Sequence, residues 1–137
     1  MNLTHPLAVD TWSAEECAAV MAVLDSERVT MWKRTAEFEA AFARRLGVAH
    51  AVMVNSGSSA NLIAVAAMEQ ALQRQGRTLR GKVAVVPAIA WATTYAPLHQ
   101  HGMRLRVVDV DIDTLNIDPL AVRKAICPET AIVVVAN

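Results

Sequence analysis

Four short apolar runs, rich in β-branched residues, most constrain the fold that this chain can adopt. They lie at residues 49–54, 83–86, 105–110 and 131–135. Their apolar residues follow one another instead of alternating with polar ones, which is typical of strands covered on both faces. Helical segments separate the runs. Alternation of strand and helix predicts the α/β class, with a mostly parallel sheet flanked by helices.

The helical segments begin and end at ordinary capping signals. Ser13 with Glu16 three positions later is a capping box, and Asp118 before Pro119 is a typical helix start. We expect helices over residues 14–24, 35–46, 58–75, 93–101 and 119–125. The first half of the helix at 58–75 is apolar nearly all round, which predicts that this half is buried.

The chain is expected to contain two parts. Residues 1–48 form an N-terminal helical segment, and residues 49–137 form the first part of an α/β domain. The sequence stops at Asn137, directly after an apolar run, whereas chain termini usually lie at the surface of a domain. We therefore expect a truncated chain whose large domain is incomplete.

Composition excludes several classes of function. The chain is 54% hydrophobic with thirteen basic and thirteen acidic residues, so it is neither disordered nor built to bind nucleic acid electrostatically. Prolines and polar residues interrupt the long uncharged stretches, which argues against a membrane span, and residues 1–10 lack the features of a signal peptide. Cys17 and Cys127 match no metal spacing and suit a reducing compartment. We expect a cytoplasmic protein with no membrane partner.

The turn after the first apolar run is a candidate anion site. It reads Asn55-Ser56-Gly57-Ser58-Ser59-Ala60-Asn61 and leads into a helix. The amides of Ser58 and Ser59 belong to the first helical turn, where donors are unpaired and the helix dipole favours a phosphate. Gly57 would let a ligand approach the backbone. The alternative is a strand-to-helix turn in which the serines serve only as caps.

The segment after the second apolar run is a candidate binding site for a flat ligand. It reads Pro87-Ala88-Ile89-Ala90-Trp91-Ala92-Thr93-Thr94, and the Trp91 ring could stack on such a ligand. The alternative is that Trp91 belongs to the core. Parallel sheets bind ligands at the carboxyl ends of their strands, where both segments lie.

The other polar clusters do not predict a metal site. Asp109, Asp111 and Asp113 alternate as in a calcium loop, but the glycine and glutamate that such a loop needs are missing. His99 and His101 would diverge on a helix and have no third ligand. We therefore predict no metal ligand.

Together these segments resemble the N-terminal part of the DegT/DnrJ/EryC1/StrS family of sugar aminotransferases. The matching segments, in order, are Glu37-Phe38-Glu39 with Phe42-Ala43, Ala51-Val52-Met53-Val54-Asn55-Ser56-Gly57-Ser58-Ser59-Ala60-Asn61-Leu62, Val86-Pro87-Ala88 with Trp91-Ala92-Thr93-Thr94, and Val108-Asp109-Val110-Asp111 with Thr114-Leu115-Asn116-Ile117-Asp118. The resemblance covers residues 6–137. It implies the large domain of a fold type I enzyme, similar to aspartate aminotransferase, that depends on pyridoxal 5'-phosphate (PLP).

The resemblance also implies roles for particular residues. Gly57, Ser58 and Ser59 would hold the cofactor phosphate, and Trp91 would stack on its pyridine ring. The complete protein would be a PLP-dependent aminotransferase. Its substrates would be a nucleotide-linked keto sugar and an amino donor, in the synthesis of deoxyamino sugars or surface polysaccharides. The complete protein would be a homodimer. Trp32 departs from the family, many of whose members have glycine there, so a sugar contact by this segment is not implied.

The catalytic group of the family is not among these residues. The Schiff-base lysine, or the histidine that replaces it, would follow Asn137, and we expect none of Lys33, Lys82 and Lys124 to be catalytic. Members with lysine are aminotransferases. Members with histidine use pyridoxamine 5'-phosphate (PMP) and dehydrate a nucleotide-linked 4-keto-6-deoxy sugar at C3, and this alternative stays open. So do a non-catalytic truncated fragment and a phosphate-binding module.

Overall fold

The computed structural model describes residues 10–136. Residues 1–9 and Asn137 lie outside the described residues. The prediction that residues 1–10 lack the features of a signal peptide therefore falls almost entirely outside them. The chain separates into two compact units, one ending at Met53 and one beginning at Val54. The assignment of residues 49–53 to the α/β domain stays a prediction.

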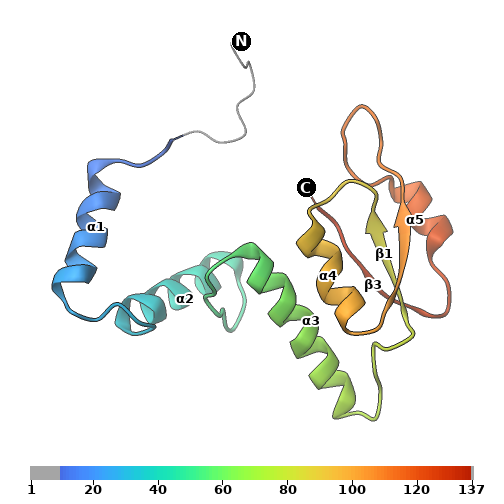
Figure 1. The fold of residues 1–137 in the computed structure, drawn as a ribbon, viewed down its shortest axis with the longest axis horizontal. Coiled ribbons are helices and arrows are strands. Elements are labelled where there is room, and N and C mark those ends of the chain that lie inside the picture. The colour runs from blue at the N-terminus through green and yellow to red at the C-terminus, as the bar shows by residue number, and fades with distance from the viewer. Residues whose placement is uncertain (1–9, 137) are drawn as a thin grey trace. The chain divides into compact units, whose positions relative to one another are not determined.

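The first unit contains two helices, α1 (Ala14–Asp25) and α2 (Lys33–Leu46) (Figure 1). The predicted capping box begins α1: the Ser13 hydroxyl accepts the Glu15 amide at 3.2 Å, and the Glu16 carboxylate accepts the Ser13 amide at 2.7 Å. The Glu16 carboxylate also accepts the Ser13 hydroxyl, and this hydrogen bond, followed by the one from the Ser13 amide, lowers the pKa of Glu16. Helix α2 ends at Gly47, whose φ of 69° is in the left-handed region that glycine adopts without strain.

The prediction of a strand at residues 49–54 is wrong for the described chain. A strand needs a neighbour to accept its backbone hydrogen bonds, and within residues 10–136 no strand pairs with this run. The Met53 amide instead donates to the Glu39 carboxylate at 2.8 Å. The apolar run at residues 49–54 therefore indicates a segment suited to form a strand, but residues 10–136 contain no neighbouring strand to pair with it.

The second unit is an α/β layer structure built on a three-stranded sheet. Its elements are α3 (Gly57–Gln73), β1 (Val83–Pro87), α4 (Ala92–Gln100), β2 (Arg104–Val108), α5 (Pro119–Ala125) and β3 (Thr130–Val133). The strand order is β2-β1-β3, and both pairings are parallel. This confirms the predicted α/β class and the parallel sheet.

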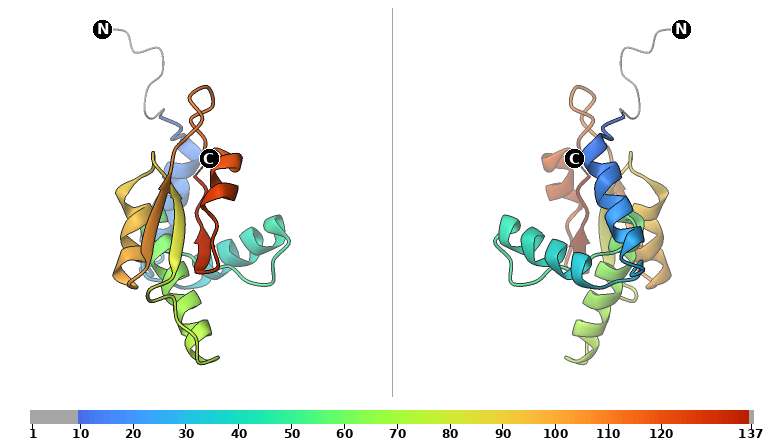
Figure 2. Two further views of the ribbon diagram at one scale, coloured as in Figure 1. Left: turned by 90° about the vertical axis from the view of Figure 1, so that its right-hand side faces the viewer. Right: turned by 90° about the vertical axis from the view of Figure 1, so that its left-hand side faces the viewer.

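Alternate residues of the central strand β1 face two separate cores. Ala84 and Val86 pack with Val65 of α3 and Leu98 of α4. Val83 and Val85 pack on the opposite side, against a cluster that includes α5. Helices therefore cover both faces of the sheet, α3 and α4 on one and α5 on the other (Figure 2). Every residue of β1 is buried, as predicted for this strand.

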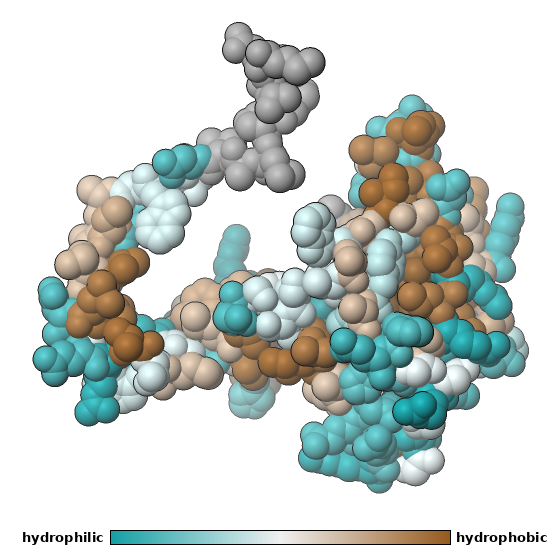
Figure 3. Space-filling view, viewed as in Figure 1, coloured by the Kyte–Doolittle hydropathy of each residue, from teal (hydrophilic) through white to brown (hydrophobic). Residues whose placement is uncertain are grey.

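Burial elsewhere is lower than the apolar pattern predicts. In β2 only Val108 is buried, and β3 has no buried residue. In α3 only Val65 is buried, while Leu62 and Ile63 are 43% and 48% exposed, so the expected burial of its first half is wrong for this chain. The helix meets the core through one face, and its other apolar residues remain at the surface, where Figure 3 shows hydrophobic patches.

Within residues 10–136, no helix has both the length and the apolar character to cross a membrane.

Candidate functional site

The N-terminus of α3 presents unpaired amides. Ser56 is the N-cap in an extended conformation, and its hydroxyl accepts the Ser59 amide at 3.1 Å. The amides of Gly57 and Ser58 have no acceptor in the described part of the chain. The sequence analysis expected Ser58 and Ser59 to supply the free amides. The unpaired amides are instead those of Gly57 and Ser58, because the Ser59 amide donates to the Ser56 hydroxyl.

Among residues 10–136, no contact requires glycine at position 57. A Cβ built on Gly57 meets no atom within 4 Å, and its φ is not in the left-handed region. The backbone at this position therefore opens onto free space. An open, side-chain-free backbone beside two unpaired amides is suited to the close approach of an anion.

Trp91 lies at the start of α4, immediately after the connection from β1. It is the N-cap of the helix in an extended conformation, and its carbonyl accepts the Thr94 amide at 2.8 Å. Its side chain is 77% exposed, so the alternative that Trp91 is a core residue is wrong for this chain. The backbone of Trp91 is fixed while its indole ring is free to meet a ligand.

Two side-chain hydrogen bonds hold these segments in place. The Ser58 hydroxyl donates to the Thr93 hydroxyl at 3.0 Å, which links the first turn of α3 to the first turn of α4. The Tyr95 hydroxyl donates to the Pro87 carbonyl at 2.7 Å and ties α4 to the end of β1. The structure thus brings Ser58 and the Trp91 segment together through the packing of α3 against α4, although residues 49–54, which precede α3, form no strand.

Sequence reasoning missed Ser56, Thr93 and Tyr95 as site residues. The signal for Ser56 was present, since a serine three residues before an amide of the first turn is a typical N-cap. No comparable signal existed for Thr93. Its partner Ser58 lies 35 positions away, and only the fold joins them.

The site is electrically neutral except for the helix ends. No Asp, Glu, Lys or Arg occurs in residues 54–61 or 87–98, and the first turns of α3 and α4 contain no acidic residue. The partial positive charge at each helix N-terminus is therefore not neutralised by a neighbouring carboxylate. In the described chain the Ser58, Ser59 and Thr93 hydroxyls bond only to other hydroxyls, so none of them donates to a general base. The arrangement can bind an anion beside a flat ring, but it has no activated nucleophile.

The lysines and the metal candidates lie outside this site. Lys33, Lys82 and Lys124 are all exposed. Asp111, a candidate calcium ligand in the sequence, stabilises its own turn: its carboxylate accepts the Thr114 amide at 2.9 Å and the Asp113 amide at 3.1 Å. Hydrogen bonds from Thr114 lower the pKa of Asp111. Among the described residues, no three His, Cys, Asp or Glu side chains gather as metal ligands.

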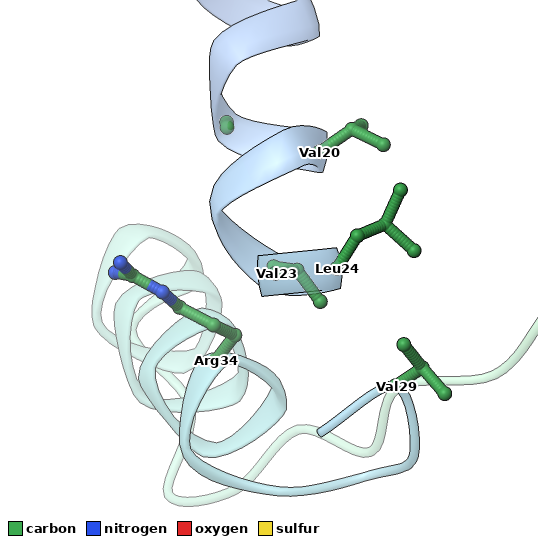
Figure 4. A pocket seen from close by; sticks show the side chains of 6 residues that line it. Val20, Val23, Leu24, Val29 and Arg34 are labelled. Carbon is green, nitrogen blue, oxygen red and sulfur yellow. The ribbon is translucent and has the colours of Figure 1, made fainter. Parts of the chain in front are cut away.

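The first unit contains a separate apolar groove (Figure 4). Its volume is about 500 Å³, and it is lined by Ala19, Val20, Val23, Leu24, Val29 and Arg34. The only charged group is Arg34, which pairs with Glu37 at 3.1 Å. Nothing in this lining resembles a catalytic or phosphate-binding arrangement.

Comparison with known proteins gives one consistent family. Residues 10–137 match the DegT/DnrJ/EryC1/StrS aminotransferase family. A GDP-4-keto-6-deoxy-D-mannose 3-dehydratase of Escherichia coli O55:H7 is 41% identical over 135 residues, which are 98% of this chain and 34% of that protein. This chain therefore spans about a third of the length of the curated relatives it matches.

Solved structures agree with the sequence comparison. The E. coli GDP-4-keto-6-deoxy-D-mannose 3-dehydratase with bound hydrated PLP superposes with a TM-score of 0.86 at 41% identity, covering 96% of this chain and 33% of that one. Helicobacter pylori PseC, an aminotransferase involved in the biosynthesis of pseudoaminic acid, has a TM-score of 0.77 at 29% identity, covering 90% of this chain and 32% of that one. The chain thus has the fold of about a third of these PLP-dependent enzyme structures.

Proposed function

The chain belongs to the DegT/DnrJ/EryC1/StrS aminotransferase family, and from this membership we propose that it is the cofactor-holding N-terminal part of an enzyme that acts on a nucleotide-linked keto sugar. The observation that carries the proposal is the pair of unpaired amides at Gly57 and Ser58, joined through one hydroxyl pair to the segment that presents Trp91. The cofactor is PLP or PMP.

The residues present fit such a cofactor. Gly57, Ser58 and Ser59 would hold its phosphate through backbone amides and hydroxyls, and the end of α3 would stabilise the charge. Trp91 would stack on the ring and fix its plane. When bound, the cofactor supplies the electron sink for the reaction. The contribution of this chain is anchoring and orientation, since none of its exposed lysines lies in this site.

Similarity favours dehydration over transamination as the reaction of the complete protein. The matching dehydratase is 41% identical to this chain, whereas the aminotransferase PseC is 29% identical. We therefore place a PMP-dependent 3-dehydratase of a nucleotide-linked 4-keto-6-deoxy sugar first. An aminotransferase of such a sugar is the second candidate, because both kinds of enzyme share this N-terminal fold.

Product analysis distinguishes the two reactions. The complete gene product is incubated with PMP, glutamate as amino donor and GDP-4-keto-6-deoxy-D-mannose, and the sugar product is identified by mass spectrometry. A 3-dehydratase yields a sugar that has lost the C3 hydroxyl and gained no nitrogen. An aminotransferase yields an amino sugar that keeps this hydroxyl. An unchanged sugar, with this substrate and with related nucleotide-linked keto sugars, contradicts both assignments.

A phosphate-binding module without catalysis is tested by titration. The proposed site should bind PMP more tightly than inorganic phosphate, because Trp91 contacts the ring, and Trp91→Ala should remove most of that difference. Trp12→Ala is the matched control, since Trp12 is also well exposed, at 68%, but lies in the first unit. Equal binding of PMP and phosphate by the wild-type protein would support the module instead.

The assembly and location of the complete protein are part of the same proposal. We propose a cytoplasmic homodimer; the cytoplasm is supported by two free cysteines, Cys17 and Cys127, in the described chain. Light scattering on the complete gene product tests the dimer. A monomer at working concentration would contradict it.

A further inference from the structure

We propose that Thr93 is a positioning residue that aims the Ser58 hydroxyl at the cofactor phosphate and joins the phosphate site to the Trp91 segment. This inference rests on the proposed function of the site. Its carrying observation is the hydrogen bond between the two hydroxyls, 3.0 Å long and half-buried between α3 and α4.

The Ser58 hydroxyl can donate only one hydrogen bond at a time. A serine hydroxyl has one proton to donate and lone pairs that accept. In the structure Ser58 donates this proton to Thr93. When Ser58 donates to a phosphate oxygen, its proton is no longer available to Thr93. The pair keeps its hydrogen bond only if Thr93 then donates to Ser58, which fixes the Ser58 oxygen and leaves its proton directed at the anion.

Thr93 is also close in sequence to the residue that would contact the cofactor ring. Thr93 lies two residues after Trp91, in the first turn of α4, and Trp91 itself has no side-chain contact that caps the helix. Tyr95 links α4 to Pro87 at the end of β1, and Thr93 links α4 to Ser58 of α3. A shift of Ser58 is therefore transmitted to the backbone that carries the indole ring. The first turn of α3 would bind the phosphate and the Trp91 segment would contact the ring of the same cofactor, and these two segments would move together.

The test compares ligands with and without the phosphate. Dissociation constants for PMP and for pyridoxamine are measured by calorimetry on the complete gene product. Thr93→Val keeps the shape of the side chain and removes the hydroxyl, so PMP affinity should fall about five- to tenfold, the size of one lost hydrogen bond between the neutral hydroxyls of Ser58 and Thr93. Pyridoxamine affinity should change less than twofold, and Thr93→Ser should restore PMP binding.

Two further variants separate positioning from general stability. Thr94→Val changes the same residue type in the same helical turn, where the hydroxyl makes no hydrogen bond in the described chain, and it should leave both affinities unchanged. In a Ser58→Ala background, Thr93→Val should have no further effect on PMP affinity, because Thr93 acts through Ser58. This cycle also works with Thr93→Ala if Thr93→Val does not fold.

The outcomes separate this inference from the proposed function. If the wild-type protein does not prefer PMP over pyridoxamine, the proposed cofactor site fails. If the wild type shows the preference but Thr93→Val keeps it in full, the cofactor site stands and the role of Thr93 is refuted. Equal loss of both ligands in Thr93→Val, or additive losses with Ser58→Ala, would also refute positioning through Ser58.

Discussion

Trp91 and Leu98 belong to the same helical segment but contribute differently to stability. Trp91 is 77% exposed and Leu98 is 1% exposed. We expect Trp91→Ala to change the free energy of unfolding by no more than about 0.5 kcal/mol, because little packing is lost. Leu98→Ala should cost about 2–5 kcal/mol, because it opens a cavity between α4 and the sheet. Urea unfolding of the cofactor-free gene product measures both.

A large loss of stability in Trp91→Ala would show that the indole is packed against a part of the protein outside residues 10–136. It would also weaken the assignment of this ring to the cofactor.

The cap of α3 depends on a single hydroxyl. Ser56 accepts the Ser59 amide, so Ser56→Ala should destabilise the first turn by about 1 kcal/mol. The expected readout is faster hydrogen exchange of the Ser59 and Ala60 amides, which bond to Ser56, with little change at β1. Ser56→Thr is the matched control, since threonine also caps helices. Equal exchange in Ser56→Ala and wild type would contradict the role of the cap.

At this scale the sequence predicted residues that act through the backbone or stand alone. Gly57 and Trp91 could be identified because their chemistry is local: one lacks a side chain, and the other is a large ring after a strand. Thr93 could not be, because its role depends on Ser58, which only the parallel sheet brings near. Long-range hydrogen bonds leave no periodic pattern in a single sequence.

At the level of elements, the helices and β1 were predicted closely and the strand at 49–54 was not. Capping signals are local, so helices such as α5 began where Asp118 and Pro119 indicated. Strand formation instead depends on a neighbour. Residues 83–86 gained two neighbouring strands, β2 and β3, and became the centre of the sheet. Residues 49–54 have no such neighbour within the described chain and remain irregular.

Glu69 stabilises the connection from α3 to β1. Its carboxylate accepts the Thr78 hydroxyl and the Leu79 backbone amide, each at 2.6 Å, and the side-chain amide Nε2 of Gln73 at 2.9 Å. The hydrogen bond from Thr78, followed by that from Leu79, lowers the pKa of Glu69 below its ordinary value of 4.5. Leu79 is fully buried in the core that faces α3 and α4. This carboxylate therefore fixes a core residue through its backbone.

The lowered pKa gives a prediction with a definite sign. A carboxyl group that ionises more easily in the folded protein stabilises it above the unfolded pKa, and this contribution is lost as the pH falls through the folded pKa. Glu69→Gln should therefore lower the melting temperature at pH 7, and the difference from wild type should shrink below about pH 4.5. Thermal unfolding across this range measures it.

Glu27→Gln, which makes the same substitution at an exposed glutamate of the first unit, is the control. A constant offset between Glu69→Gln and wild type at every pH would mean that the ionised form has no special role.

For the whole molecule, the sequence predicts a sheet that is more fully buried than the sheet in this chain. The apolar runs were interpreted as strands buried on both faces, yet only β1 is fully buried. Burial is a property of what surrounds an element, and this chain spans about a third of its curated relatives. The apolar pattern of residues 58–75 and 105–110 therefore indicates that these residues are suited to a buried environment. Residues 10–136 alone bury them only in part.

This difference leads to a prediction about residues 1–137 as an isolated polypeptide. Its second unit exposes large apolar side chains, among them Val107 at 61%, Ile112 at 83%, Leu120 at 68% and Val135 at 59%. Exposed apolar patches and open strand edges promote association. We expect the isolated polypeptide to self-associate in light scattering and to enhance the fluorescence of a hydrophobic dye. Replacing Val107 and Leu120 by Lys should reduce both signals. Monomeric behaviour without dye binding would show that these side chains need no further part of the protein to cover them.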